Sequence, residues 1–182
     1  MRRLLIADSG PLFSLAAGDL LDILSHLRVA ITDIVKEETI DRGLIAGCSV
    51  EAQRLLAYYT RNARSITVYE TQVGAMVRAD RAHDPSFKSP RNLGEISIQS
   101  LLIEFQVRPV QPPPLVLFED AWFLRNATGL ARPFGLISTR AFLLNAEKAG
   151  LIQSAETALE AIRVGGRSPA ATTLAREFRA AP

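Results

Sequence analysis

Cysteine and histidine are scarce in the 182-residue sequence, in which Cys48, His26 and His83 are the only residues of these types. A single cysteine forms no intrachain disulfide, so a reducing, cytoplasmic compartment is the expected location. A nucleophilic role for Cys48 is disfavoured, because neither histidine lies in a motif typical of a thiol–imidazole pair. These absences argue against a disulfide-stabilised secreted protein and against a cysteine-dependent enzyme.

Long apolar runs and a strong charge excess are also missing. No stretch approaches the roughly 18 apolar residues of a membrane span, and Asp8 interrupts the amino-terminal apolar run too early for a secretory signal. The net charge of +2 is too small to indicate nucleic-acid binding by itself. The 48% hydrophobic content predicts a globular protein with no membrane partner. We expect one domain over residues 1–164 and a helical tail over residues 165–182.

Two apolar runs in this sequence end in carboxylates. Leu4–Ala7 is followed by Asp8 and a Ser-Gly-Pro turn, and Leu115–Phe118 is followed by Glu119 and Asp120. Short apolar runs bounded by turn residues predict strands buried on both faces. The carboxyl ends of parallel strands meet at one edge of a sheet, where α/β proteins bind their ligands. The pattern therefore predicts an α/β fold that brings these carboxylates together, although Asp8 as a mere helix cap is the simpler alternative.

Helical patterns separate the predicted strands. The further strands are expected at 29–31, 65–69 and 135–137, and the helices at 12–24 with a break near Gly18, 34–40, 49–62, 71–82, 93–105, 121–130, 140–149, 153–164 and 168–179. Glu38 projects from the apolar face of helix 34–40, where a carboxylate needs a salt bridge or a metal. Glu95 lies in the first turn of helix 93–105, where the helix dipole alone would favour it. Arg78 and Arg81 indicate either a phosphate-binding surface or an ordinary solvated helix face.

Four acidic residues, Asp8, Glu38, Glu95 and Asp120, thus come from separate elements. Brought together without a counter-charge, they would repel one another and raise one another's pKa values. A divalent ion removes that cost, and Mg²⁺ and Mn²⁺ prefer such oxygen ligands. These ions also activate water for attack on a phosphodiester. The four acids are therefore a candidate metal site.

Several segments resemble the PIN domain in the form carried by VapC-type toxins. The resemblance rests on Leu4 to Leu15, on Ile34-Val35-Lys36-Glu37-Glu38, and on Gly94-Glu95 with its helix. The nearest likeness is Asp120 with an Arg five residues on and an Ala seven residues on, and residues 137–152 resemble the segment that closes that fold. The resemblance covers most of the chain except about 41–91 and the residues after 164.

This resemblance implies a three-layer α/β/α sandwich around a mainly parallel sheet, and a ribonuclease that uses Mg²⁺ or Mn²⁺. It implies catalytic and metal-binding roles for Asp8, Glu38, Glu95 and Asp120, and a polar position beside them at Thr139. Many members of the family are toxins held in check by an antitoxin. The expected partners are therefore RNA, a cognate antitoxin protein and a second copy of the chain.

Some alternatives stay open in the sequence. Glu119 competes with Asp120 and Glu37 with Glu38 as the inward acid, and Arg140 stands where related chains often have Gly. Strand register favours Asp120, and the Val-x-x-Glu spacing favours Glu38. The leading function is a metal-dependent endoribonuclease. The alternatives are a catalytically weak module that binds RNA or protein, and a phosphate-handling domain of the phosphohydrolase or receiver kind, for which no matching nucleophile-and-lysine pattern follows either Asp.

Overall fold

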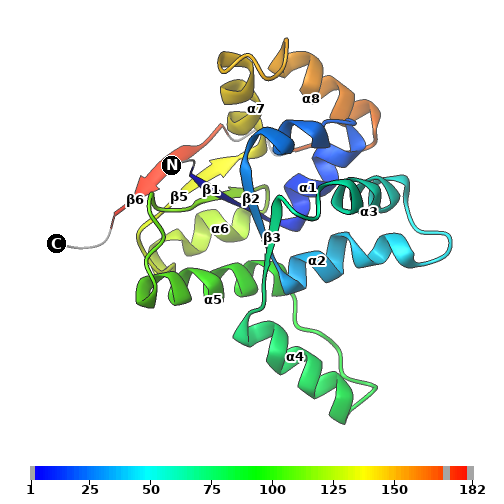
Figure 1. Ribbon diagram of the computed structural model, residues 1–182, viewed down its shortest axis with the longest axis vertical. Coiled ribbons are helices and arrows are strands. Elements are labelled where there is room, and N and C mark those ends of the chain that lie inside the picture. Colours follow the sequence, from blue (N-terminus) through cyan, green and yellow to red (C-terminus); the bar gives the residue numbers. More distant parts are fainter. Residues whose placement is uncertain (1–2, 170–172, 180–182) are drawn as a thin grey trace.

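The computed structural model describes residues 3–169 and 173–179. They form an α/β fold around a six-stranded sheet of strand order β3-β2-β1-β4-β5-β6 (Figure 1). Every strand pair is parallel except β5 with β6, which is antiparallel. Helices cover both faces of the sheet, which confirms the predicted three-layer α/β/α sandwich.

The elements match most of the predicted ones within a few residues. The strands are β1 (Leu4–Ala7), β2 (Arg28–Thr32), β3 (Ile66–Tyr69), β4 (Leu115–Phe118), β5 (Phe134–Ser138) and β6 (Ala175–Phe178). The α-helices are α1 (Ser9–Ala17), α2 (Asp33–Thr39), α3 (Val50–Asn62), α4 (Gln72–His83), α5 (Leu93–Val107), α6 (Ala121–Asn126), α7 (Thr139–Lys148) and α8 (Ala155–Val164). Short 3₁₀ helices cover Leu21–His26, Asp41–Leu44 and Ala127–Gly129.

The centre of the sheet is apolar on both faces. Leu4, Ile6, Val116 and Leu117 are fully buried, as expected of strands covered by helices on both sides. In Figure 1, α5 and α6 lie on one side of the sheet, and α1, α3, α7 and α8 lie on the other. Helix α2 contacts both α1 and α5, so it bridges the two layers at the carboxyl ends of the strands.

The predicted carboxy-terminal helix over 168–179 is wrong where the structure describes it. Residues Ala175–Phe178 instead form β6, which pairs with the edge strand β5. The ring of Phe178 stacks on that of Phe134 with 4.9 Å between centroids, and Glu177 forms an ion pair with Arg3. Tertiary contacts thus override the helical preference of the Ala-Arg-Glu sequence. The remaining predicted tail residues, 170–172 and 180–182, lie outside the described part of the chain.

No helix among the described residues is long and apolar enough to cross a membrane.

Candidate active site at the carboxyl edge of the sheet

Asp8 is the most buried of the four predicted acids. It directly follows β1, and its backbone N–H continues the β1–β4 ladder by donating to the carbonyl of Leu117 at 3.1 Å. The residue is 2% exposed, and its Oδ1 atom has no hydrogen-bond partner. Buried polar atoms are normally satisfied, so an unpaired carboxylate oxygen at this depth needs a ligand or a proton.

Glu38 and Glu95 reach the same region from α2 and α5. A β-carbon built on Gly94 would lie 3.0 Å from Oε2 of Glu38 and 3.4 Å from Oδ1 of Asp8, so both carboxylates converge on this glycine. A side chain at position 94 would crowd the two carboxylates.

The hydroxyl groups of Thr32 and Ser97 connect the starts of α2 and α5. Thr32 caps α2 by accepting a hydrogen bond from the N–H of Val35. Its hydroxyl lies 2.6 Å from that of Ser97, which donates to the carbonyl of Gly94. Thr32, Gly94 and Ser97 are all buried, so satisfied hydrogen bonds join the starts of α2 and α5, the helices that carry Glu38 and Glu95.

The two acidic residues after β4, Glu119 and Asp120, contact different partners. Glu119 accepts hydrogen bonds from Thr139 at 2.7 Å and from Ser14 at 2.9 Å, and its side chain is only 13% exposed. Asp120 is exposed and caps α6 by accepting from the N–H of Trp122. Thr139 is therefore beside the acids, as the resemblance implies, and its hydroxyl orients Glu119.

A cavity of about 330 Å³ opens at this edge of the sheet. Its lining residues are Asp8, Ser9, Gly10, Glu95, Glu119, Asp120, Arg167 and Ser168. Both acids after β4 line it, and Glu38 adjoins it through Asp8. Within residues 3–169 and 173–179, no three acidic, histidine or cysteine side chains are gathered closely enough to hold a metal ion as they stand.

The pKa values of Asp8, Glu38 and Glu95 are all raised, by burial and by neighbouring negative charges. Burial raises the pKa of Asp8 well above its ordinary range, and the charge of Glu95 raises it further, followed by Glu38 and Asp120. Burial also raises the pKa of Glu38, against a hydrogen bond from Ser9 that lowers it. The pKa of Glu95 is raised by burial and by Asp120. The four predicted acids are therefore close enough to influence one another electrostatically.

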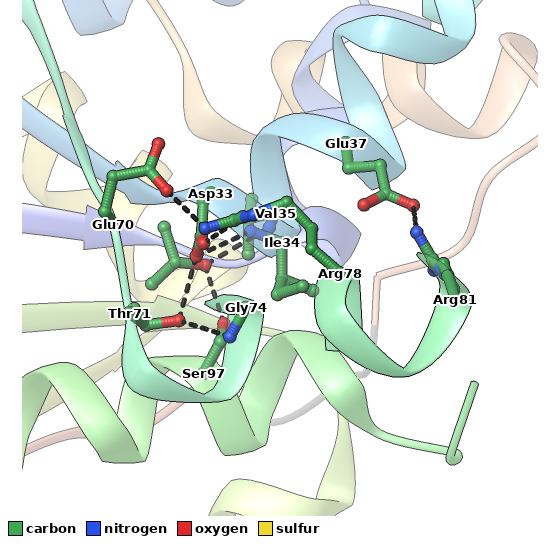
Figure 2. A network of polar contacts seen from close by, with 11 residues as sticks. Asp33, Ile34, Val35, Glu37, Glu70, Thr71, Gly74, Arg78, Arg81 and Ser97 are labelled. Carbon is green, nitrogen blue, oxygen red and sulfur yellow. Dashed lines mark hydrogen bonds and ion pairs between the residues drawn. The ribbon is translucent and has the colours of Figure 1, made fainter. Parts of the chain in front are cut away.

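Arg78 and Arg81 are engaged by carboxylates (Figure 2). Arg78 donates to the buried Asp33 and to Glu70, both at 2.6 Å, and Arg81 pairs with Glu37. Glu37 therefore faces α4, whereas Glu38 faces Asp8, in agreement with the sequence-based choice of Glu38. The pairing leaves these two arginines poorly suited to bind phosphate.

Two other arginines, Arg140 and Arg167, line hollows in the structure. Arg140 lines a separate hollow between α7 and α8. Arg167 lines the acidic cavity, and sequence analysis missed it because it follows the last helix of the predicted domain. The Gly165-Gly166 pair directly before it was the available signal.

The family models, the curated proteins and the solved structures with which the chain was compared contain no match to it. The chemistry of the acidic cavity is therefore the basis for assigning a function.

The raised pKa values predict how stability depends on pH when no metal is present. The folded state holds protons on Asp8, Glu38 and Glu95 more tightly than the unfolded chain does. Their stabilising contribution is complete below about pH 4 and is lost as the pH rises through the folded-state pKa values. In EDTA, the urea midpoint should therefore fall as the pH rises above the ordinary carboxylate range of about 4.

The Asp8→Asn variant should show a flatter pH profile and a higher urea midpoint than wild type at pH 7, because it removes the most deeply buried charge. A lower midpoint for the variant at pH 7 would contradict this electrostatic interpretation.

Proposed function

We propose that this protein is a metal-dependent endoribonuclease that hydrolyses RNA phosphodiester bonds. The observation that carries the proposal is the buried Asp8 carboxylate, which has an unpartnered Oδ1 and lies among Glu38, Glu95 and Asp120. The resemblance to PIN domains of the VapC type supports the same activity. The α/β/α architecture and the position of the acids at the carboxyl edge agree with that resemblance.

A divalent cation fits the chemistry of these side chains. Carboxylate oxygens are the preferred ligands of Mg²⁺ and Mn²⁺, and the acids would otherwise repel one another in a poorly solvated place. Asp8, Glu38, Glu95 and Asp120 would hold the ion, with small side-chain rearrangements and with water completing the ligand set. When bound, the ion supplies Lewis-acid activation of water and stabilises charge on the leaving oxygen.

Residues around the cavity orient its carboxylates and keep access to them open. Both oxygens of Glu119 accept hydrogen bonds, one from Thr139 and one from Ser14, so this carboxylate is fixed beside the cavity. Gly94 keeps the approach to Asp8 and Glu38 open. These residues therefore set the shape of the site before substrate arrives, which is what a hydrolytic site requires.

The second candidate is a binding module for RNA or protein with weak catalysis. It is favoured by one observation, that Asp120, one of the four proposed ligands, is exposed and already accepts a hydrogen bond from the N–H of Trp122 as the cap of α6. Activity with metal separates the two candidates.

Purified protein is expected to cleave single-stranded or structured RNA with Mn²⁺ or Mg²⁺ and to lose activity fully in excess EDTA. Activity should return on adding back Mn²⁺, and products mapped on end-labelled RNA should show internal cuts. RNA binding without cleavage under any of these metal conditions would favour the binding module.

We also propose that the protein is the toxin of a toxin–antitoxin pair and acts in the cytoplasm with a homodimer as its free form. The exposed apolar side chains of Leu44, Ile45 and Val50 support a covered surface, because they lie close together in the chain and are 60–73% exposed. Light scattering at high protein concentration tests the dimer, and a strictly monomeric mass would contradict it.

A further inference from the structure

We propose that Arg167 binds a phosphate group of the substrate at the acidic cavity. This inference rests on the proposed ribonuclease function and adds to it a binding residue from outside the segments that resemble PIN domains. The cavity has a volume of about 330 Å³, and Arg167 is the basic residue of a lining that otherwise holds the carboxylates of Asp8, Glu95, Glu119 and Asp120.

A turn at Gly165 and Gly166 places Arg167 beside the acidic cavity. After α8 ends at Val164, Gly165 packs against α1 so closely that a β-carbon there would lie 2.4 Å from the carbonyl oxygen of Ala17. Gly166 has a φ of +85°, a conformation that glycine adopts without strain. The N–H of Arg167 then donates to the carbonyl of Ile162 at 3.1 Å. This turn directs the following residues across α1 toward the cavity.

The guanidinium group of Arg167 is held in position, and only one of its N–H groups donates a hydrogen bond to a described residue. Its Nε donates to the hydroxyl of Ser14 at 3.1 Å, and its Cζ atom lies over the ring of Phe13, 5.6 Å from the centroid. Its Nη2 is 3.7 Å from Oε2 of Glu119, an ion pair without a hydrogen bond. A guanidinium has five N–H donors, so within the described part of the chain most of these donors remain available. The side chain is 36% exposed and open to a ligand.

Phosphate is the ligand that this arrangement favours. A cavity lined by carboxylates repels the negatively charged backbone of RNA, and the proposed cation offsets only part of that charge. The fork of N–H groups on arginine matches two phosphate oxygens at once. Arg78 and Arg81 are held in ion pairs on α4 and cannot do this without losing those contacts. Arg167 is free to exchange its long contact with Glu119 for a phosphate.

The test compares Arg167→Gln and Arg167→Lys with Arg163→Gln as a matched control. Arg163 lies on α8, is 72% exposed and pairs with Glu160. Affinity for a single-stranded RNA is measured across salt concentrations in the non-cleaving Asp8→Asn background. Arg167→Gln should weaken binding about 10-fold and reduce the salt slope by about 0.7–1, because one phosphate contact is lost. Arg167→Lys should keep the slope, and Arg163→Gln should change neither quantity.

The same variants separate this proposal from the proposed function. With Asp8 intact, Arg167→Gln should raise KM for RNA cleavage about 10-fold while the melting temperature stays near that of the Arg163→Gln control. Unchanged affinity and slope in Arg167→Gln would overturn the role of Arg167 and leave the nuclease standing. Absence of cleavage by wild type would overturn the nuclease, and the salt slope would still decide whether Arg167 contacts phosphate. An RNA affinity too weak to measure in the Asp8→Asn protein would also overturn the role of Arg167.

Discussion

Asp8→Asn is expected to lower the rate of metal-dependent RNA cleavage by more than about 100-fold. Loss of groups outside the ligand set of a metal already costs about 10–100-fold in affinity or activity, and Asp8 is the buried centre of the proposed ligand set. The variant should stay folded, because the amide has nearly the same shape and relieves repulsion between like charges. RNA binding should also persist, since phosphate contacts from basic residues supply most of it.

The matched control is Asp22→Asn. The Asp22 side chain is 83% exposed, and its Oδ1 lies 3.8 Å from Nη2 of Arg61. Neither residue lines the acidic cavity. This control should cleave RNA at the wild-type rate. Equal cleavage by wild type, Asp8→Asn and Asp22→Asn would mean that the activity comes from a contaminant or from another site.

Gly74→Ala is expected to give the largest loss of stability. A β-carbon at this position would lie 1.9 Å from Oδ2 of Asp33 and 2.5 Å from its Cγ. Asp33 cannot easily move, because Thr71 and Arg78 both donate to it in a site where its side chain is 6% exposed (Figure 2). We expect a loss of about 3 kcal/mol in unfolding free energy, the upper end of what overpacking usually costs. For a chain of this size that corresponds to about 6–12 °C in Tm.

Gly129→Ala is the control for this prediction. A β-carbon on Gly129 would meet no atom within 4 Å, so its unfolding free energy should stay within about 0.5 kcal/mol of wild type. Urea denaturation of the three proteins measures both values. Similar midpoints for Gly74→Ala and wild type would show that α4 docks in another way or contributes little to stability.

The parts of the fold that the sequence predicts are those determined by local pattern. Leu4–Ala7 and Leu115–Phe118 are recognisable because buried parallel strands consist of consecutive apolar residues. The carboxylates that follow them are then placed at one edge by topology alone. The meeting of Asp8 with Glu38 and Glu95 is instead implied by the resemblance to PIN domains, because both glutamates lie on helices, and the raised pKa of Asp8 agrees with it.

The features that the sequence did not predict depend on contacts between distant segments. β6 pairs with the free edge of β5, and Phe178 stacks on Phe134. The pairing of Arg78 depends on Asp33, whose burial against α4 has no local sequence signal. Glu119 and Asp120 are adjacent in the sequence, so local pattern does not separate their roles. In the structure, the hydroxyls of Ser14 and Thr139 donate to Glu119 and orient it. These contacts have no periodic signature.

The divalent-cation site is tested most directly by titrating EDTA-treated protein with Mn²⁺ at pH 7 and counting free ions by electron paramagnetic resonance. Wild type should bind Mn²⁺ at a specific site, and Asp8→Asn should bind it at least about 10-fold more weakly. Asp22→Asn should behave as wild type does. Absence of Mn²⁺ binding by wild type at millimolar concentrations, or equal binding by Asp8→Asn, would contradict the assignment of the acidic cavity as a metal site.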